Sequence, residues 1–118
     1  MTIVANAVVI LVALLHVYFL VLEMFLWDKP AGLKAFGQSK EKAEATKVLA
    51  ANQGLYNGFL AAGLLLGVVL GDSGTYFKLF FLSCVIVAGV YGALTASRKI
   101  LFIQALPALI GLILVILS

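Results

Sequence analysis

Hydrophobic residues run along the chain in four long stretches that polar residues interrupt only briefly. The stretches cover roughly residues 3–27, 48–70, 75–97 and 100–117. Each is close to the ~20 residues that a helix needs to cross about 30 Å of hydrocarbon. Backbone polar groups in lipid must be satisfied within the spanning element, which a helix achieves and an open strand edge does not. The pattern predicts an all-α integral membrane protein whose residues 1–118 form a single four-span domain.

The connectors between the stretches predict how the helices are arranged. The first connector, residues 28–47, is the only long one, and Pro30 near its start should end the first helix. Ser39 is the expected N-cap of a polar helical turn that leads into the second stretch. The other connectors are the tetrapeptide GDSG at Gly71–Gly74 and the pair Arg98–Lys99. Turns this short join antiparallel neighbours, so we expect an up-down four-helix bundle.

Composition and charge support a membrane location and give it a direction. Hydrophobic residues make up 64% of the 118 residues and charged residues 11%, whereas a soluble domain is about half apolar and about a quarter charged. Seven basic residues lie in the first and third connectors, against Lys78 alone near the other side. The positive-inside rule then places these connectors in the cytoplasm and both termini outside. We expect a multi-pass protein of a bacterial inner membrane, with the lipid bilayer and not nucleic acid as its partner.

The most informative polar residues lie inside the first stretch, HVYFLVLEMFLW, from His16 to Trp27. His16 and Glu23 are seven residues apart and therefore share one stripe of a helix. A charged group in mid-membrane costs roughly 2.5–3.5 kcal/mol on insertion scales, so such residues usually face the interior or a wet cavity. Counting ~1.5 Å per residue places Glu23 level with Asn52.

The other stretches also carry polar residues at that depth, which predicts a polar pocket in the cytoplasmic half of the bundle. Glu23 and His16 are the candidate proton donors or acceptors, and thus the candidate catalytic residues. The candidate ligand-binding residues are Trp27, Asn52, Gln53, Tyr56, Asn57, Tyr91 and Gln104.

Small residues recur at helical spacing beside the polar positions. Gly54, Gly58 and Ala62 form one such stripe, and Gly89 and Ala93 belong to another. Small residues four apart let a neighbouring backbone approach closely, so we interpret these positions as helix-packing sites.

The outer half of the bundle should be almost wholly apolar, broken by little more than Ser83 and Cys84. Pro107 is expected to kink the last helix. One histidine, one membrane glutamate and one distant cysteine do not make a ligand set, so the sequence predicts no metal site and no cofactor.

The stretches HVYFLVLEMFLW and KVLAANQGLYNGFLAAG resemble the small bacterial membrane proteins of domain-of-unknown-function family 1304. The resemblance covers essentially the whole chain. It implies an integral membrane protein with four helices and no assigned biochemistry. It also implies that the polar positions of these two stretches are characteristic of the family: His16, Glu23, Trp27, Asn52, Gln53, Tyr56 and Asn57.

Three functions are compatible with these residues. The leading hypothesis is a pocket, open to the cytoplasmic leaflet, that binds a small amphipathic or lipid-like molecule through Glu23, with His16 deeper in. If the protein is an enzyme, these groups suit proton transfer. The alternatives are a proton-coupled transporter acting as a homodimer through the glycine stripes, and a membrane scaffold or assembly subunit whose polar layer binds a partner helix. The sequence leaves open whether the protein catalyses, transports or scaffolds.

Overall fold

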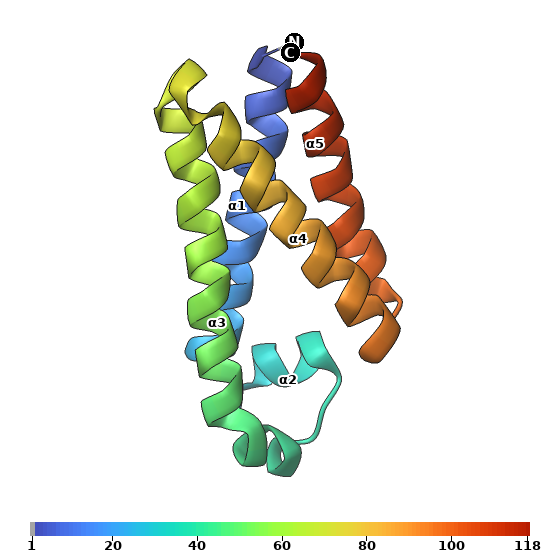
Figure 1. Ribbon diagram of the computed structural model, residues 1–118. Helices are drawn as coiled ribbons and strands as arrows, with labels where there is room; N and C mark the ends of the chain where they lie inside the picture. Colours follow the sequence, from blue (N-terminus) through green and yellow to red (C-terminus); the bar gives the residue numbers. More distant parts are fainter. Residues whose placement is uncertain (1) are drawn as a thin grey trace. The chain divides into compact units, whose positions relative to one another are not determined.

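The computed structural model describes residues 2–118, which are helical almost throughout and contain no strand (Figure 1). The prediction of an all-α protein is confirmed over this range. In chain order the elements are α1 (Thr2–Met24), α2 (Pro30–Phe36), α3 (Lys40–Val69), the short 3-10 helix η1 (Gly71–Gly74), α4 (Thr75–Thr95), the π-helix η2 (Leu101–Ala105) and α5 (Leu106–Leu117).

The observed boundaries differ from the predicted ones mainly at the first connector. Helix α3 begins at Lys40, well before the apolar stretch at residue 48. Ser39 explains this start, because its Oγ accepts a hydrogen bond of 3.2 Å from the backbone N–H of Lys42. An N-cap residue satisfies one of the unpaired N–H groups of the first turn. The predicted N-cap is therefore confirmed, and polar residues extend the helix beyond its apolar part.

The chain divides into two compact units, which are described separately. Unit 1 consists of Met1–Leu14 and Leu60–Ser118, and unit 2 consists of Leu15–Phe59. Helices α1 and α3 each contribute one part to each unit.

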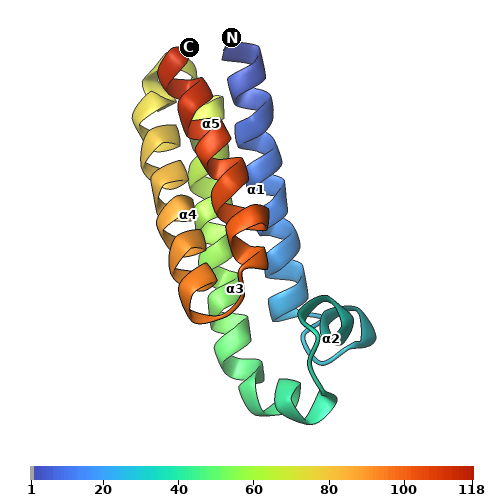
Figure 2. The ribbon, with the colours of Figure 1, turned by 90° about the vertical axis from the view of Figure 1, so that its right-hand side faces the viewer.

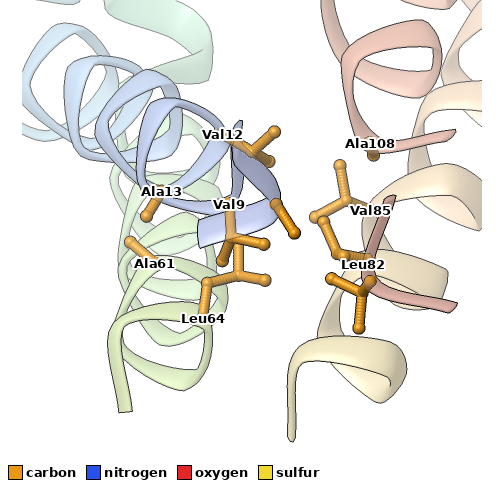
Figure 3. Packing of buried hydrophobic residues seen from close by; sticks show 10 residues of the cluster. Val9, Val12, Ala13, Ala61, Leu64, Leu82, Val85 and Ala108 are labelled. Atoms are coloured by element: carbon orange, nitrogen blue, oxygen red, sulfur yellow. The ribbon is translucent and has the colours of Figure 1, made fainter. Parts of the chain in front are cut away.

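Unit 1 has a core of aliphatic side chains from α1, α3, α4 and α5. Figure 3 shows Val9 and Val12 of α1, Leu64 of α3 and Val85 of α4 converging at its centre. These four side chains are at most 1% exposed. Both ribbon views show α4 and α5 running side by side in opposite directions (Figures 1 and 2). The short connection predicted from Arg98–Lys99 therefore does join antiparallel neighbours.

A close backbone approach in unit 1 is located where α4 meets the π-helix. A Cβ atom on Gly89 would lie 2.7 Å from the backbone nitrogen of Ala105. Real Cβ contacts of this length essentially do not occur, so glycine permits the approach. The π-helical turn Leu101–Ala105 lies just before Pro107, the residue at which a kink was predicted. Such turns insert one extra residue into a helix and are frequent at functional sites.

Unit 2 is built around Trp27, which anchors the connector to α3. Its indole Nε1 donates a hydrogen bond of 3.1 Å to Thr46 Oγ1, and its ring packs against Phe36 with centroids 4.8 Å apart. Lys47 forms an ion pair with Asp28, with Nζ and Oδ2 3.0 Å apart. These contacts hold the residues between α1 and α3 in a defined conformation.

The short helix α2 depends on two glycines with different roles. At Gly32 a Cβ atom would lie 2.0 Å from the carbonyl oxygen of Leu26, so no larger residue fits against that backbone. Gly37 ends the helix with φ +60°, a conformation that L side chains rarely adopt. Both glycines are thus needed for α2 to turn back toward the end of α1.

Two helical segments are long and apolar enough to span a membrane, Thr2–Met24 and Gly71–Thr95, and Leu101–Leu117 is apolar but shorter. Helix α3 has 30 residues. Its residues 40–57 include lysines, glutamates and the amides of Asn52, Gln53 and Asn57, which lower the mean hydropathy of the helix.

Candidate functional site

The central residue of the candidate site is Glu23, which lies in the last turn of α1 in unit 2. The residue is 2% exposed. A carboxylate removed from water must be satisfied by hydrogen bonds or by an opposite charge. The environment of Glu23 therefore decides what the site can do.

Two amide side chains of α3 satisfy this carboxylate. Gln53 Nε2 donates a hydrogen bond of 2.7 Å to Oε2 of Glu23, and Asn57 Nδ2 donates to Oε1. Gln53 and Asn57 are four residues apart, so they lie one above the other on the same helix face. Each carboxylate oxygen accordingly has its own donor. We refer to Glu23, Gln53 and Asn57 as the Glu23 cluster.

Glycines of α3 allow the segments of α1 and α3 in unit 2 to approach closely enough for these contacts. A Cβ atom on Gly54 would lie 2.7 Å from Met24 Cγ and 3.1 Å from Glu23 Cβ. On Gly58 it would lie 2.7 Å from Leu20 Cδ1. The stripe of small residues thus lies against α1, and the amides beside it reach Glu23.

The members of the Glu23 cluster differ in their access to the surroundings. Glu23 and Asn57 are buried, at 2% and 9% exposure, whereas Gln53 is an exposed residue. Both partners of the carboxylate are neutral, and among residues 2–118 no lysine or arginine forms an ion pair with it. The cluster is therefore a buried carboxylate whose exposed side is covered by one amide. Such a group is complementary to a hydrogen-bond donor or a cation.

His16 is buried in unit 2, with 0% exposure. Its ring packs edge-to-face on Phe19, with centroids 5.5 Å apart. Seven residues of helix separate it from Glu23, which corresponds to about 10 Å along the axis. The two side chains therefore lie on the same face of α1, as expected, but two helical turns apart.

Other predicted binding residues do not belong to the Glu23 cluster. Asn52 is exposed on a different face of α3, whereas Tyr56, which is 55% exposed, lies beside Gln53 on the helix surface. Tyr91 and Gln104 belong to unit 1. Tyr91 is 68% exposed and borders an apolar hollow on α4, while Gln104 is partly buried within the π-helix.

The predicted packing residues also occupy different environments. Gly54 and Gly89 are buried, and Gly58 and Ala93 are partly buried. The three glycines make close approaches to neighbouring segments. Ala62, in contrast, is exposed. Trp27 contributes to the connector through Thr46 and Phe36. No three His, Cys, Asp or Glu side chains of residues 2–118 gather as a metal site would require.

Sequence reasoning missed a buried polar pair in unit 1. Lys78 in the first turns of α4 is only 5% exposed, and its Nζ donates a hydrogen bond of 3.0 Å to Asn6 Oδ1. From the sequence, Lys78 was expected only to mark the topology, and the outer half was expected to contain little polar beyond Ser83 and Cys84; the buried pair of Lys78 and Asn6 adds to that expectation. The available signal was Asn6, the one amide in the first apolar stretch.

Comparisons with known proteins agree with the resemblance noted in the sequence. Residues 10–116 match the family described as "Protein of unknown function (DUF1304)". The "Uncharacterized protein YpaA" of Lactococcus lactis subsp. lactis (strain IL1403) is 32% identical over 115 residues, which cover 96% of this chain and 97% of that protein. No solved structure matches the chain. The chain belongs to the DUF1304 family.

Proposed function

We propose that this DUF1304 protein is a multi-pass membrane protein whose Glu23 cluster binds the polar end of a small amphipathic or lipid-like molecule. The membrane part of the proposal is supported by the apolar surface of both units. Large apolar side chains face outward along every long helix, among them Ile3 at 85% exposure, Val48 at 83% and Leu94 at 82%. A surface of this kind suits lipid and would be a liability in water.

Four spans are the topology that we propose for this chain. Two helices have the length and composition of spans. Helix α3 and the apolar segment Leu101–Leu117 would supply the other two, with the first connector and Arg98–Lys99 in the cytoplasm. The Glu23 cluster would then lie in the cytoplasmic half, near the inner end of the first span.

The observation that carries the binding proposal is the contrast between Glu23 and Gln53. The carboxylate is buried, whereas Gln53, one of its two donors, is an exposed residue that holds it through a partly buried hydrogen bond. An incoming N–H or O–H group would take the place of Gln53 on Oε2, while Asn57 continues to hold Oε1. Exchange of one hydrogen bond for another costs little, so such a site opens without unfolding.

The surroundings of Gln53 suit the apolar part of the same molecule. Leu49 and Tyr56 are four residues before and three residues after Gln53, which makes them its neighbours on the helix surface. They are 73% and 55% exposed. A molecule with a donor-bearing head and an apolar body would therefore contact Glu23 and these two side chains together.

The chemistry available to a bound molecule is proton exchange with Glu23. The carboxylate oxygen released by Gln53 would face the donor group of the ligand at hydrogen-bond distance. A general acid or base must be within such reach of the proton that it transfers. Isomerisation by proton transfer is the reaction class that this arrangement suits.

Native mass spectrometry of gently solubilised protein tests the proposal. The wild type should carry a small-molecule adduct that Glu23→Gln loses. Glu44→Gln provides the matched control, because Glu44 is an exposed glutamate of α3 outside the cluster, and it should retain the adduct. Equal adducts on all three proteins would contradict the proposal. An adduct-free dimer would favour the transporter instead.

A further inference from the structure

A second polar site lies in unit 1, where Lys78 of α4 meets Asn6 of α1. It plays no part in the binding proposed for Glu23. Lys78 is 5% exposed, and a lysine is almost never this deeply buried unless it is paired. Its only hydrogen-bond partner among residues 2–118 is the neutral oxygen of Asn6. No carboxylate of the described chain neutralises the amine.

The position of Lys78 is fixed by glycines and not by a counter-ion. A Cβ atom on Gly67 would lie 2.7 Å from Lys78 Cγ and 3.1 Å from the carbonyl oxygen of Gly74. A Cβ atom on Gly74 would in turn lie 2.0 Å from the carbonyl oxygen of Gly67. These glycines let the lysine stem lie along α3 and direct its amine to Asn6.

The hydrogen bond between the two side chains fixes which groups remain available. A charged lysine amine has hydrogen-bond donors but no acceptor, so the group of Asn6 that faces it must be the side-chain oxygen. The NH₂ group of Asn6 is bonded to the same carbon as this oxygen, and no acceptor among residues 2–118 occupies it. An ammonium group has three donors, of which this bond uses one. Adjacent N–H groups of a cation and an amide are thus left without acceptors.

Such a set of donors is complementary to an oxyanion. Hydrogen bonds from a charged amine to an anionic oxygen are about twice as strong as neutral ones. Asn6 is only partly buried, so a ligand can reach the pair along that side chain. The geometry points to an anion-binding site at Lys78 and Asn6, which takes a phosphate-type oxyanion either free or on a lipid headgroup.

The test measures the affinity of the purified, detergent-solubilised protein for two probes, inorganic phosphate and dihexanoylphosphatidic acid, from the rise in its melting temperature. Saturable binding of either probe is expected in the wild type. Lys78→Met keeps the stem that packs on Gly67 but removes the charge, and should weaken binding by about tenfold or more, as expected for a hydrogen bond to a charged group. Binding of both probes indicates a free-anion site, and binding of the lipid alone indicates a headgroup site.

Two further variants separate binding from folding. Asn6→Asp supplies an internal carboxylate to Lys78 and should abolish binding while the protein remains folded, which keeps the test decisive if Lys78→Met does not fold. Lys99→Met removes an exposed lysine and should bind like the wild type. The site does not exist if neither probe binds the wild type saturably. Equal affinities in the wild type and Asn6→Asp would overturn the proposal in the same way.

Discussion

The unequal burial of the two donors to Glu23 makes a quantitative prediction about stability. Asn57→Ala removes a buried donor and leaves Oε1 of a buried carboxylate unsatisfied. Gln53→Ala removes an exposed donor, whose place water or a lipid headgroup can take. The first substitution should therefore cost clearly more free energy of unfolding than the second.

The expected magnitudes follow from two ranges. Hydrogen bonds to charged groups contribute about 1.5–3 kcal/mol in proteins. Hydrogen bonds between membrane helices average about 0.6 kcal/mol and reach about 1.7 kcal/mol. The buried bond from Asn57 should fall where these ranges meet, so Asn57→Ala should cost about 1.5 kcal/mol. Gln53→Ala should cost no more than the membrane average of about 0.6 kcal/mol.

Trp27 provides the assay, because it is the single tryptophan of the chain and lies in the same unit as the Glu23 cluster. Unfolding of the wild type and variants by sodium dodecyl sulfate in mixed micelles can be followed through its emission. Asn52→Ala is the matched control, an exposed amide on another face of α3, and should change stability by less than about 0.5 kcal/mol.

Equal losses of stability in Gln53→Ala and Asn57→Ala would contradict the prediction. A neutral Asn57→Ala would refute it too, since the carboxylate would then need no buried donor. Adding Glu23→Ala to each variant completes a double-mutant cycle, and the coupling energy should be larger for Asn57 than for Gln53.

Two further predictions concern the connector of unit 2. Gly32→Ala should destabilise the protein by about 1–3 kcal/mol, the usual range for overpacking, because the added Cβ atom would meet the backbone of Leu26. In the same unfolding assay Gly58→Ala should cost less, because its Cβ atom would meet only the tip of a leucine side chain. The hydrogen bond from Lys47 holds the pKa of the Asp28 carboxyl below its ordinary value, so Lys47→Met should raise that pKa, as measured by carboxyl ¹³C NMR. Because the folded pKa is the lowered one, the ion pair stabilises the fold above the ordinary pKa of about 3.9 and ceases to do so as the pH falls through the folded value.

Each of these predictions has its own contrary result. Equal losses at the two glycines would mean that α2 shifts to accommodate a methyl group, and that the close approach at Gly32 is not needed. An Asp28 pKa unchanged by Lys47→Met, but raised by Lys29→Met, would assign the effect to the neighbouring charge instead of the hydrogen bond.

Much of the helical arrangement could be predicted from the length of the apolar stretches. Apolar length alone does not show how far polar residues extend a helix, which is why α3 starts at Lys40 and not at residue 48. The π-helix at Leu101–Ala105 ends at the residue whose backbone packs closely against Gly89. That contact joins residues far apart in sequence, so no local pattern contains it.

The candidate site was predictable in its members but not in its pairing. At about 100° per residue, Gln53 and Asn57 differ by only about 40° around α3, whereas Asn52 lies about 140° from Asn57. The sequence does not show which of these two amide faces lies against Glu23. In the structure Gly54 and Gly58 pack against α1, where their small size lets the backbones approach, and this packing determines which face it is. The two amides beside that stripe reach Glu23, and Asn52 faces outward.

The buried lysine escaped prediction for a different reason. A single basic residue near the end of an apolar stretch is ordinarily explained by snorkelling to the interface. Only the packing of Gly67 and Gly74 around its stem turns Lys78 inward to Asn6. That arrangement depends on the turn between α3 and α4, where GDSG forms a 3-10 helix.

The most direct test of the central proposal is whether a ligand displaces Gln53 from Glu23. Side-chain amide NMR of delipidated protein would follow Gln53, Asn57 and Asn52 while an organic extract of the undelipidated wild type is added back. We predict a saturable shift of the Gln53 NH₂ signals, a much smaller one at Asn57, and none in Glu23→Gln. If Gln53 does not move, or moves equally with Asn52 and in Glu23→Gln, then the Glu23 cluster is not a binding site and only joins α1 to α3.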